Sequence, residues 1–326
     1  MLYRRHILNI EDLSVQDLGF ILSVADRIAE NPESYGEICK GKILATLFFE
    51  PSTRTRLSFE SAMLRMGGRV LGFSEASTSS TAKGETPEDT ARMIAGYADV
   101  VAVRHPTALV PHRMSAVSEV PLINGGDGSN EHPTQTLTDL VTIHRRFGSL
   151  ENLTIGLCGD LKHGRTVHSL IKAMKLYPGT RFVLIAPDAL EMPKEFLDSL
   201  DVAGIPYRLT DNLEASMPEL DILYMTRIQR ERFQNPTEYR KLKGVYVLDA
   251  DKMAMAKKEM IVMHPLPRVD EIATDVDADP RAFYFEQAKC GVLARMALII
   301  GVLGLENRMG EGLSVHTSAN GRELAI

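Results

Sequence analysis

The residue types best suited to chemistry gather in the segment FFEPSTRTR, which runs from residue 48 to residue 56. It combines the hydroxyls of Ser52 and Thr53 with the guanidiniums of Arg54 and Arg56, directly after an apolar run. Free N–H groups at the start of a helix bind anions, and an arginine fork adds paired contacts to phosphate oxygens. A helix cap followed by a charged helical face would use similar residues. The whole cluster at the end of a buried strand nevertheless favours a phosphate site.

Two further polar segments follow apolar residues in the first half of the chain. Arg104-His105-Pro106 ends the run DVVAVRHP, and the segment from His132 to Gln135 opens a helical pattern after Gly-Gly-Asp-Gly. Taken singly, Arg104 fits a surface ion pair equally well, and a lone histidine is more often structural than catalytic. The carboxyl ends of parallel strands meet at one edge of a sheet, where open α/β folds bind ligands. We therefore expect these segments to lie beside Arg54.

A second basic cluster is expected in the second half of the chain. Arg165 follows the apolar run LTIGLCG, and Arg227 follows DILYMT. Together they suit a small dicarboxylate, whereas either one alone fits an ordinary ion pair. In the segment HPLPR, residues 264–268, the prolines would hold carbonyl groups outward as acceptors for an amine. A simple helix-blocking connection fits that segment as well.

The segment GDLKHGRT, residues 159–166, also resembles a Walker A loop that has arginine where lysine belongs. The run VYVLD, which ends at Asp249, would then be the Walker B strand. Arginine is a poor exchange for the compact lysine ligand, and a strand that ends in aspartate is common by chance. A P-loop nucleotidase is therefore the competing interpretation from another functional class.

Short apolar runs alternate with amphipathic stretches, a pattern typical of parallel βαβ units. It predicts strands over residues 41–50, 99–106, 153–160, 181–187, 221–227, 245–249 and 260–265. It predicts helices over residues 13–30, 53–66, 132–147 and 283–305, and one that begins at Thr86. Thr86 offers a capping hydroxyl, and a proline and two acids follow it.

The predicted fold class is α/β, with two doubly wound domains that have parallel sheets and an active site in the cleft between them. The first domain is expected to span residues 1–134 and to be completed by a C-terminal helix over 285–305. The second is expected to span 150–284. Residues 306–326 are polar and rich in Gly and Ser, which predicts a loosely ordered tail.

Composition limits the classes of partner. The chain has 326 residues, with 37 Lys and Arg and 43 Asp and Glu, for a formal net charge of −6. This length suits about two domains, and the mild acidity argues against nucleic acid or an anionic membrane as the main partner. The three scattered cysteines form no CxxC pair, which indicates free thiols in a reducing compartment and no zinc site. Without an apolar run long enough for a signal peptide or a membrane span, we expect a cytoplasmic protein.

Six segments, in order along the chain, resemble the aspartate/ornithine carbamoyltransferase family: FFEPSTRTRLSFE, VRHP, GSNEHPTQTL, GDLKHGRTVHSL, MTRIQRERF and MHPLPRVDEI. The resemblance extends to about Leu305, and STRTR and HPLPR are highly specific together. Ornithine-specific members typically carry a Ser-Met-Gly loop and a cysteine in the second proline motif. This chain has TRIQRERF and HPLPR at those places, so the resemblance favours aspartate as the acceptor.

The resemblance implies an enzyme that transfers the carbamoyl group of carbamoyl phosphate to the amine of L-aspartate. The products would be N-carbamoyl-L-aspartate and phosphate, in pyrimidine biosynthesis. It implies no cofactor and no metal. A carbamoyltransferase for another amino acid, such as ornithine, is an alternative, as is a catalytically silent binding protein on the same fold. Whether a separate regulatory chain binds stays open.

The resemblance also implies a role for each matched residue around carbamoyl phosphate. The implied phosphate ligands are Ser52, Thr53, Arg54 and Thr55. Arg104 would bridge the phosphate and the carbonyl oxygen, which Thr55 and His132 would also contact. The carbamoyl amide would be held by Gln135 and by the backbone at Pro265 and Leu266. The first domain would therefore bind carbamoyl phosphate.

The second domain would bind L-aspartate through Arg165, Arg227 and Gln229. A loop of a neighbouring subunit would supply Ser79 and Lys83, although Ser80 is an alternative for the serine. Lys83 would then contact aspartate and take part in catalysis with Arg54, Thr55, Arg104 and His132. A loop that crosses between subunits implies a homotrimer with shared active sites. From composition alone the loop reads as a solvated Gly/Ser segment.

Overall fold

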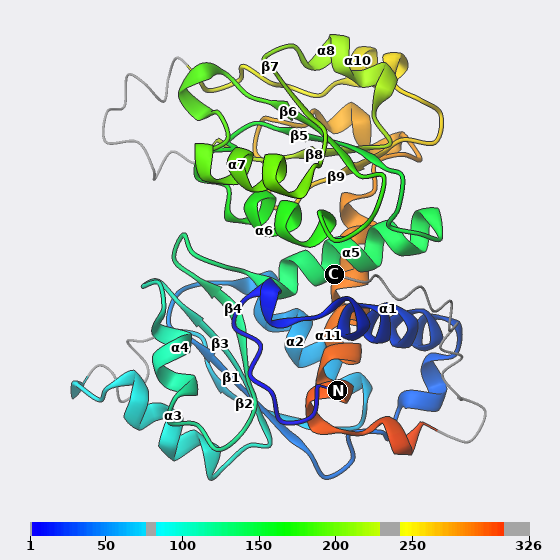
Figure 1. The fold of residues 1–326 in the computed structure, drawn as a ribbon. Coiled ribbons are helices and arrows are strands. Elements are labelled where there is room, and N and C mark those ends of the chain that lie inside the picture. Colours follow the sequence, from blue (N-terminus) through cyan, green and yellow to red (C-terminus); the bar gives the residue numbers. More distant parts are fainter. Residues whose placement is uncertain (1, 76–82, 229–241, 310–326) are drawn as a thin grey trace, which may run out of the picture.

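The computed structural model describes residues 2–75, 83–228 and 242–309. It shows two lobes, each built around a parallel sheet, with helices between and around them (Figure 1). The first sheet has the strand order β2-β1-β3-β4. Its strands are β1 (Ile43–Phe48), β2 (Arg69–Phe73), β3 (Val100–His105) and β4 (Leu122–Asp127). The helices of this lobe are α1 (Val15–Glu30), α2 (Thr53–Arg65), α3 (Pro87–Ala95) and α4 (Val110–Ser115).

The second sheet has the strand order β7-β6-β5-β8-β9, and its neighbouring strands are again all parallel. Its strands are β5 (Thr154–Cys158), β6 (Arg181–Ile185), β7 (Tyr207–Thr210), β8 (Ile222–Met225) and β9 (Ile261–Met263). The helices that accompany it are α6 (Arg165–Met174), α7 (Lys194–Ala203), α8 (Leu213–Ser216) and α10 (Ala250–Met255). The predicted α/β fold class with two parallel-sheet domains is confirmed.

In each sheet the direction in which strands are added reverses at the strand that comes first in the sequence, β1 or β5. The reversal lies between β1 and β3 in the first sheet and between β5 and β8 in the second. Loops that leave neighbouring strands in opposite directions open a crevice at the carboxyl ends of those strands. Arg54, Arg104, Arg165 and Arg227 lie at or after the ends of these four strands, so the strand orders place both basic clusters at crevices.

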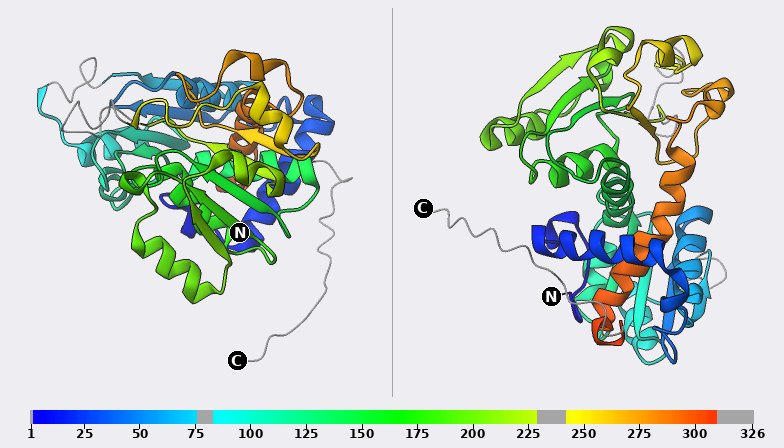
Figure 2. Two further views of the ribbon diagram at one scale, coloured as in Figure 1. Left: turned by 90° about the horizontal axis from the view of Figure 1, so that it is seen from above. Right: turned by 90° about the vertical axis from the view of Figure 1, so that its right-hand side faces the viewer.

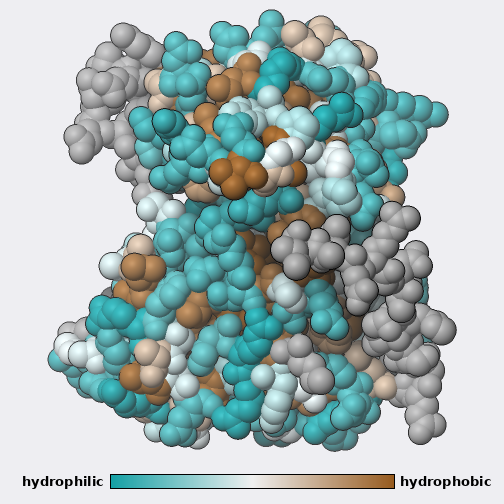
Figure 3. Space-filling model, in the orientation of Figure 1, coloured by the Kyte–Doolittle hydropathy of each residue, from teal (hydrophilic) through white to brown (hydrophobic). Residues whose placement is uncertain are grey.

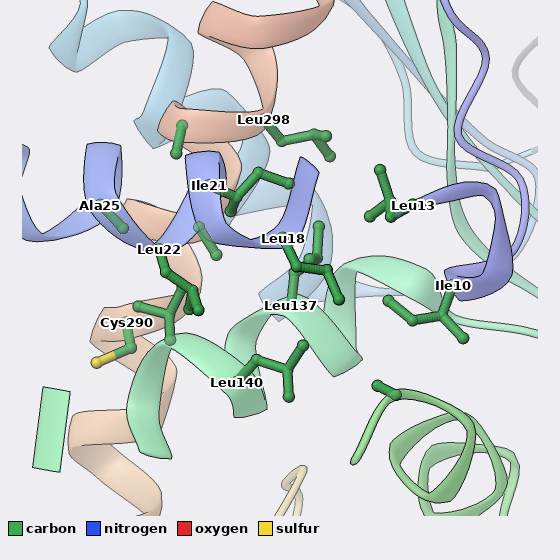
Figure 4. Packing of buried hydrophobic residues seen from close by; sticks show 14 of the residues in the cluster. Ile10, Leu13, Leu18, Ile21, Leu22, Ala25, Leu137, Leu140, Cys290 and Leu298 are labelled. Carbon is green, nitrogen blue, oxygen red and sulfur yellow. The ribbon is translucent and has the colours of Figure 1, made fainter. Parts of the chain in front are cut away.

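Two long helices join the lobes. α5 (Pro133–Phe147) lies between them, and α11 (Tyr284–Leu303) runs from the second lobe into the first, as the right-hand view of Figure 2 shows. α11 packs against α1, α2 and α5, while α5 also packs against α6. Leu18, Ile21, Leu22 and Ala25 of α1 lie against α5 and α11 in the core (Figure 4). The same buried cluster continues to β5 and α6, so the two lobes share one core.

Local sequence signals explain where several helices begin. Ser14 caps α1, since its Oγ accepts from the Asp17 N–H at 3.1 Å and Asp17 Oδ2 accepts from the Ser14 N–H at 3.0 Å. Thr86 caps α3 in the same way, with its Oγ1 accepting from the Asp89 N–H at 3.1 Å. The predicted start of that helix is confirmed.

One predicted strand is wrong, and three strands were not predicted. Residues 245–249 form no strand: Leu248 makes only an isolated bridge to Ile272. Tyr246 and Leu248 are buried in the same cluster as Met253 of α10, which explains the misleading pattern. The missed strands are β2, β4 and β7. β2 and β7 are partly exposed edge strands, and β4 ends in Asn-Gly-Gly-Asp, so each lacks a continuous apolar run.

The predicted tail begins with an ordered turn. Glu306–Arg308 form a 3-10 turn, and Arg308 Nη1 donates to the Ile38 carbonyl at 3.1 Å. The remaining part of that prediction, residues 310–326, lies outside the described residues. The face drawn in Figure 3 is mostly hydrophilic, with hydrophobic residues in small groups. Among the described residues, no helix is both long enough and apolar enough to cross a membrane.

Candidate active site

The segment after β1 forms one end of the site. β1 stops at Phe48 and α2 begins at Thr53, so Pro51 and Ser52 make the turn between them. Ser52 occupies the N-cap position, yet its side chain makes no capping hydrogen bond. The first backbone N–H groups of a helix have no partner within the helix, and its dipole favours an anion there. The predicted strand–turn–helix arrangement is confirmed, and it leaves the Ser52 hydroxyl unused by the helix cap.

Arg104 and His132 come from neighbouring parts of the same sheet edge. Arg104 lies at the end of β3, where its Nη1 donates to the Gly125 carbonyl at 3.2 Å and its Nε lies 2.7 Å from Glu50 Oε1. His132 is the buried N-cap residue of α5, and its Nε2 lies 3.5 Å from Thr55 Oγ1. The ends of β1 and β3 and the start of α5 therefore meet, as the sheet-edge argument predicted.

Arg165 reaches this group from the second lobe. It is the first residue of α6, and its Nη1 donates to the carbonyl of Gly128 in the loop after β4. A Cβ atom built on Gly126 would lie 2.8 Å from Arg104 Nη1, 3.3 Å from Arg165 Nη2 and 3.3 Å from His132 Cδ2. Two guanidiniums and an imidazole thus converge on one backbone position. That position carries glycine because it leaves no room for a side chain.

Burial and neighbouring cations control the charge of this group. Burial lowers the pKa of His132 well below its ordinary value, and Arg165, Arg104 and Arg295 lower it further. The imidazole is therefore neutral at pH 7. The pKa of Arg54 is also lowered, first by burial and then by the charge of Arg104. Several cations held close together in a partly desolvated site favour an anionic ligand.

The ends of β5 and β8 are tied together in the second lobe. Thr226 Oγ1 accepts from the Asp160 N–H at 2.9 Å and donates to the Cys158 carbonyl at 3.0 Å. Arg227 follows directly, so its position depends on this junction. The proposed Walker B residue behaves differently. Asp249 caps α10 by accepting from the Lys252 N–H at 2.9 Å, and it does not line the cleft described next.

A cleft of about 740 Å³ lies between the lobes and collects most of the predicted residues. Those that line it are Ser52, Thr53, Arg54, Thr55, Arg104, His132, Gln135, Arg165, Arg227, Pro265 and Leu266. Lys83 is exposed and does not line the cleft of its own chain. Ser79, its alternative Ser80 and Gln229 lie outside the described residues.

Sequence reasoning missed several lining residues, among them Glu50, Tyr284, Gln287 and Arg295. Glu50 stands within the FFEPSTRTR segment but was given no role, although its carboxylate pairs with Arg104. Gln287 and Arg295 belong to α11, whose composition reads as a buried apolar helix. A buried arginine in such a helix was the available signal, because a charge is rarely buried without a specific partner. Arg295 Nη1 donates to the Gly291 carbonyl at 2.8 Å, and its guanidinium lies over the Phe59 ring.

Within the described ranges, no group of three or more His, Cys, Asp or Glu side chains is placed to hold a metal ion. Five arginines of the described part of the chain and a helix N-terminus line the cleft instead. Two parallel-sheet lobes with such a cleft between them define a class of α/β proteins that bind small anions between two domains. The arrangement suits a phosphate group near α2 and carboxylate groups near Arg165 and Arg227.

Comparison with known proteins places the chain within this class. Residues 5–145 match the carbamoyl-P binding domain of aspartate/ornithine carbamoyltransferases, and residues 151–302 match the Asp/Orn binding domain. The chain therefore belongs to the aspartate/ornithine carbamoyltransferase family. It is 56% identical over 306 residues to the aspartate carbamoyltransferase catalytic subunit of Clostridium novyi, with 94% of this chain and 100% of the relative covered. The corresponding subunit of Lachnoclostridium phytofermentans is 58% identical over 302 residues, with 92% and 98% covered.

Solved structures of relatives have the same fold. The aspartate transcarbamoylase of Trypanosoma cruzi in complex with carbamoyl phosphate and aspartate superposes with a TM-score of 0.87 at 40% identity, covering 93% of this chain and 98% of that one. The same enzyme has been solved with N-(phosphonacetyl)-L-aspartic acid, at a TM-score of 0.85 and 41% identity, covering 93% and 96% of the two chains. The catalytic subunit of the M. jannaschii aspartate transcarbamoylase superposes with a TM-score of 0.86 at 44% identity, covering 93% of this chain and 99% of that one.

We predict that Gly126→Ala weakens the binding of inorganic phosphate about tenfold or more, because the new methyl group would displace Arg104, Arg165 and His132. Gly148→Ala is the matched control. Gly148 also has a positive φ, of 74°, but an added Cβ there meets no atom within 4 Å. Titration calorimetry with phosphate should show reduced affinity for Gly126→Ala alone. Equal affinities in the two variants would contradict the convergence on Gly126.

Proposed function

We propose that this protein is an aspartate carbamoyltransferase, which transfers the carbamoyl group of carbamoyl phosphate to the amine of L-aspartate. The observation that carries the proposal is the convergence of Arg104, Arg165 and His132 on Gly126, in a cleft that both lobes line. The names of the relatives and the ligands of the Trypanosoma cruzi structures support it. N-carbamoyl-L-aspartate and phosphate are the products, and pyrimidine biosynthesis is the proposed pathway.

The first lobe, proposed as residues 1–134 with the helix over 285–305, binds carbamoyl phosphate. Its phosphate lies at the N-terminus of α2, held by the backbone and side chains of Ser52, Thr53, Arg54 and Thr55. Support comes from the unused Ser52 hydroxyl and from the cationic surroundings of Arg54. Burial and the charge of Arg104 lower the pKa of Arg54, which means that its charged form is destabilised when no anion is bound. A bound dianion stabilises that charged form again.

The second lobe, proposed as residues 150–284, binds L-aspartate. Arg165 and Arg227 hold its two carboxylates, with Gln229 as a further ligand. The Arg165 side chain already reaches the first lobe through Gly128, which places the acceptor next to the carbamoyl group. The carbonyl groups of Pro265 and Leu266 then receive the attacking amine and the carbamoyl amide.

The chemical step follows from where negative charge develops. The amine nitrogen forms a bond to the carbonyl carbon, and charge builds on the carbonyl oxygen. Thr55, Arg104 and His132 donate to that oxygen. The low pKa of His132 makes it a poor proton acceptor but a suitable neutral donor, so it acts as donor and not as general base.

The intermediate collapses when the bond between the carbonyl carbon and the phosphate oxygen breaks. Arg54 stabilises the departing phosphate, which also takes the proton that the amine releases. Lys83 of a neighbouring subunit adds a second cation. Holding both substrates in line supplies much of the remaining acceleration, and no covalent intermediate with the enzyme is formed.

The proposed assembly is a homotrimer with shared active sites. Two observations support it: Lys83 is exposed outside its own cleft, and Leu57 and Leu64 present exposed apolar side chains on the outer side of α2. Large exposed side chains one helical heptad apart are typical of a surface that another chain covers. The protein is proposed to work in the cytoplasm.

The function is tested by phosphate release from carbamoyl phosphate. L-Aspartate should support turnover, whereas L-ornithine as acceptor, or ATP in place of carbamoyl phosphate, should support little. Arg54→Ala should lower kcat about 100-fold or more, because it removes charge that stabilises the leaving phosphate. Arg65→Ala, at the other end of the same helix, is the matched control. Release that depends on ATP, or on ornithine, would overturn the proposed activity.

The shared site is tested by mixing two inactive variants, Lys83→Ala and Arg54→Ala. Random exchange pairs an intact Arg54 with a neighbour's intact Lys83 at one site in four, so roughly a quarter of wild-type activity should return. Each variant alone, taken through the same exchange, is the control. No recovery after verified subunit exchange would contradict the crossing of Lys83 between subunits.

A further inference from the structure

Behind the wall of the cleft lies a buried carboxylate that has no role in the proposed chemistry. Asp139 of α5 is fully buried. Its Oδ1 accepts hydrogen bonds from Gln135 Nε2 at 2.9 Å and from Gln287 Nε2 at 2.7 Å, while its Oδ2 accepts from the Tyr224 hydroxyl at 3.0 Å. These donors come from α5, α11 and β8. One carboxylate therefore joins both lobes to the helix that runs between them.

The chemistry of the carboxylate determines how the two glutamines are turned. An ionised carboxylate only accepts hydrogen bonds, so both glutamines must direct their NH2 groups toward Asp139. Their carbonyl oxygens then point away from it. For Gln287 this oxygen accepts the backbone N–H of His264 at 2.8 Å. For Gln135, which lines the cleft, the carbonyl oxygen is the end offered to a ligand.

The same hydrogen-bond chain continues into the loop over residues 264–268. His264 Nδ1 accepts the Leu266 N–H at 2.8 Å, so the ring proton lies on Nε2, which is 2.7 Å from Glu271 Oε1. This fixes the backbone at Pro265 and Leu266, both of which line the cleft. Asp139 thus sets acceptor groups in two segments, the Gln135 side chain directly and the loop through Gln287.

We propose that Asp139 is a positioning residue that makes the cleft select a carbamoyl group over other acyl groups. The inference rests on the proposed carbamoyl transfer. A carbamoyl NH2 group brings two N–H donors, which need acceptors, whereas the methyl group of acetyl phosphate has a similar size and brings none. If the acceptor groups of the cleft are fixed and cannot turn to present donors, they pair with the N–H groups of carbamoyl phosphate. Acetyl phosphate leaves the same acceptors unpaired and therefore binds more weakly.

The test compares carbamoyl phosphate with acetyl phosphate in Asp139→Asn. Asparagine keeps the shape but replaces one accepting oxygen with a donor, and its remaining neutral oxygen holds the glutamine NH2 groups more weakly than a carboxylate does. The measured quantity is the inhibition constant of acetyl phosphate divided by the KM of carbamoyl phosphate. We expect this ratio to fall about 10- to 100-fold, almost entirely through carbamoyl phosphate.

Tyr224→Phe is the matched control, because it removes one hydrogen bond from the same carboxylate. It acts at Oδ2 and leaves both glutamines on Oδ1, so at a pH well above the pKa of Asp139 the ratio should stay unchanged even if stability falls. An equal fall of the ratio in Tyr224→Phe would indicate general disruption of the core and overturn the proposal.

A second measurement uses the wild-type protein and does not depend on the folding of a variant. Burial raises the pKa of Asp139 to about 7. The polar and charged groups that face the carboxylate act in the opposite direction: the hydrogen bonds of Gln135, Gln287 and Tyr224 and the charge of Arg295 lower this pKa. Above this pKa the carboxylate accepts all three bonds. As the pH falls through it, the carboxyl group takes up a proton, loses an acceptor position and loses the charge that makes Oδ1 a strong acceptor for both glutamines.

The selectivity ratio of the wild type should therefore decline between about pH 8 and about pH 6. The ratio compares two phosphate ligands with the same acceptor present, so ionisation of the aspartate amine cancels. A constant ratio over this range, or an unchanged ratio in folded Asp139→Asn, would overturn the inference and leave the proposed function intact. A wild-type protein that releases no phosphate from carbamoyl phosphate would overturn both.

Discussion

The rest of the structure depends on the crowding of cationic side chains around Gly126. Arg104 and Arg165 repel each other, and their approach is offset by the carbonyls of Gly125 and Gly128, which accept their hydrogen bonds, and by the carboxylate of Glu50, which forms an ion pair with Arg104. These acceptors hold the guanidiniums in place without neutralising the whole cluster. An anion that enters the cleft therefore meets donors that are already oriented, which is the condition for strong stabilisation of developing negative charge.

Holding side chains from two lobes at one point requires a rigid connection between the lobes. α5 and α11 provide it, since both pack into the core that runs from α1 to α6. α5 also begins at the site, with His132 at its N-cap position and Gln135 in its first turn. Residues proposed to bind the substrate therefore belong to the same helix that connects the two lobes. The buried hydrogen bonds of Asp139 connect the same helix to β8 and α11.

The sequence predicted the parts of the site that follow strong strand patterns. ILATLF before Pro51 and VVAVRH before Pro106 have long apolar runs, so the edge at which Arg54 and Arg104 meet could be inferred from sheet geometry alone. β4 could not be inferred, because Gly125 and Gly126 interrupt its apolar run. A side chain at Gly126 would collide with the cationic groups of the site. Similarly, the pattern of 245–249 predicts a strand because Tyr246 and Leu248 are buried, while burial alone does not specify backbone pairing. The roles of Gln287 and Arg295 depend on contacts between distant segments, for which a single sequence carries no spacing signal.

The central claim is that one cleft binds a phosphate group and a dicarboxylate side by side. N-(phosphonacetyl)-L-aspartic acid carries both groups in a single molecule, so its affinity reports on both clusters at once. Titration calorimetry should give one tight site per chain for the wild type, with affinity reduced about 100-fold or more both in Arg54→Ala and in Arg227→Ala. Wild-type affinity in either variant would contradict the claim, because the two basic clusters would then not serve one ligand.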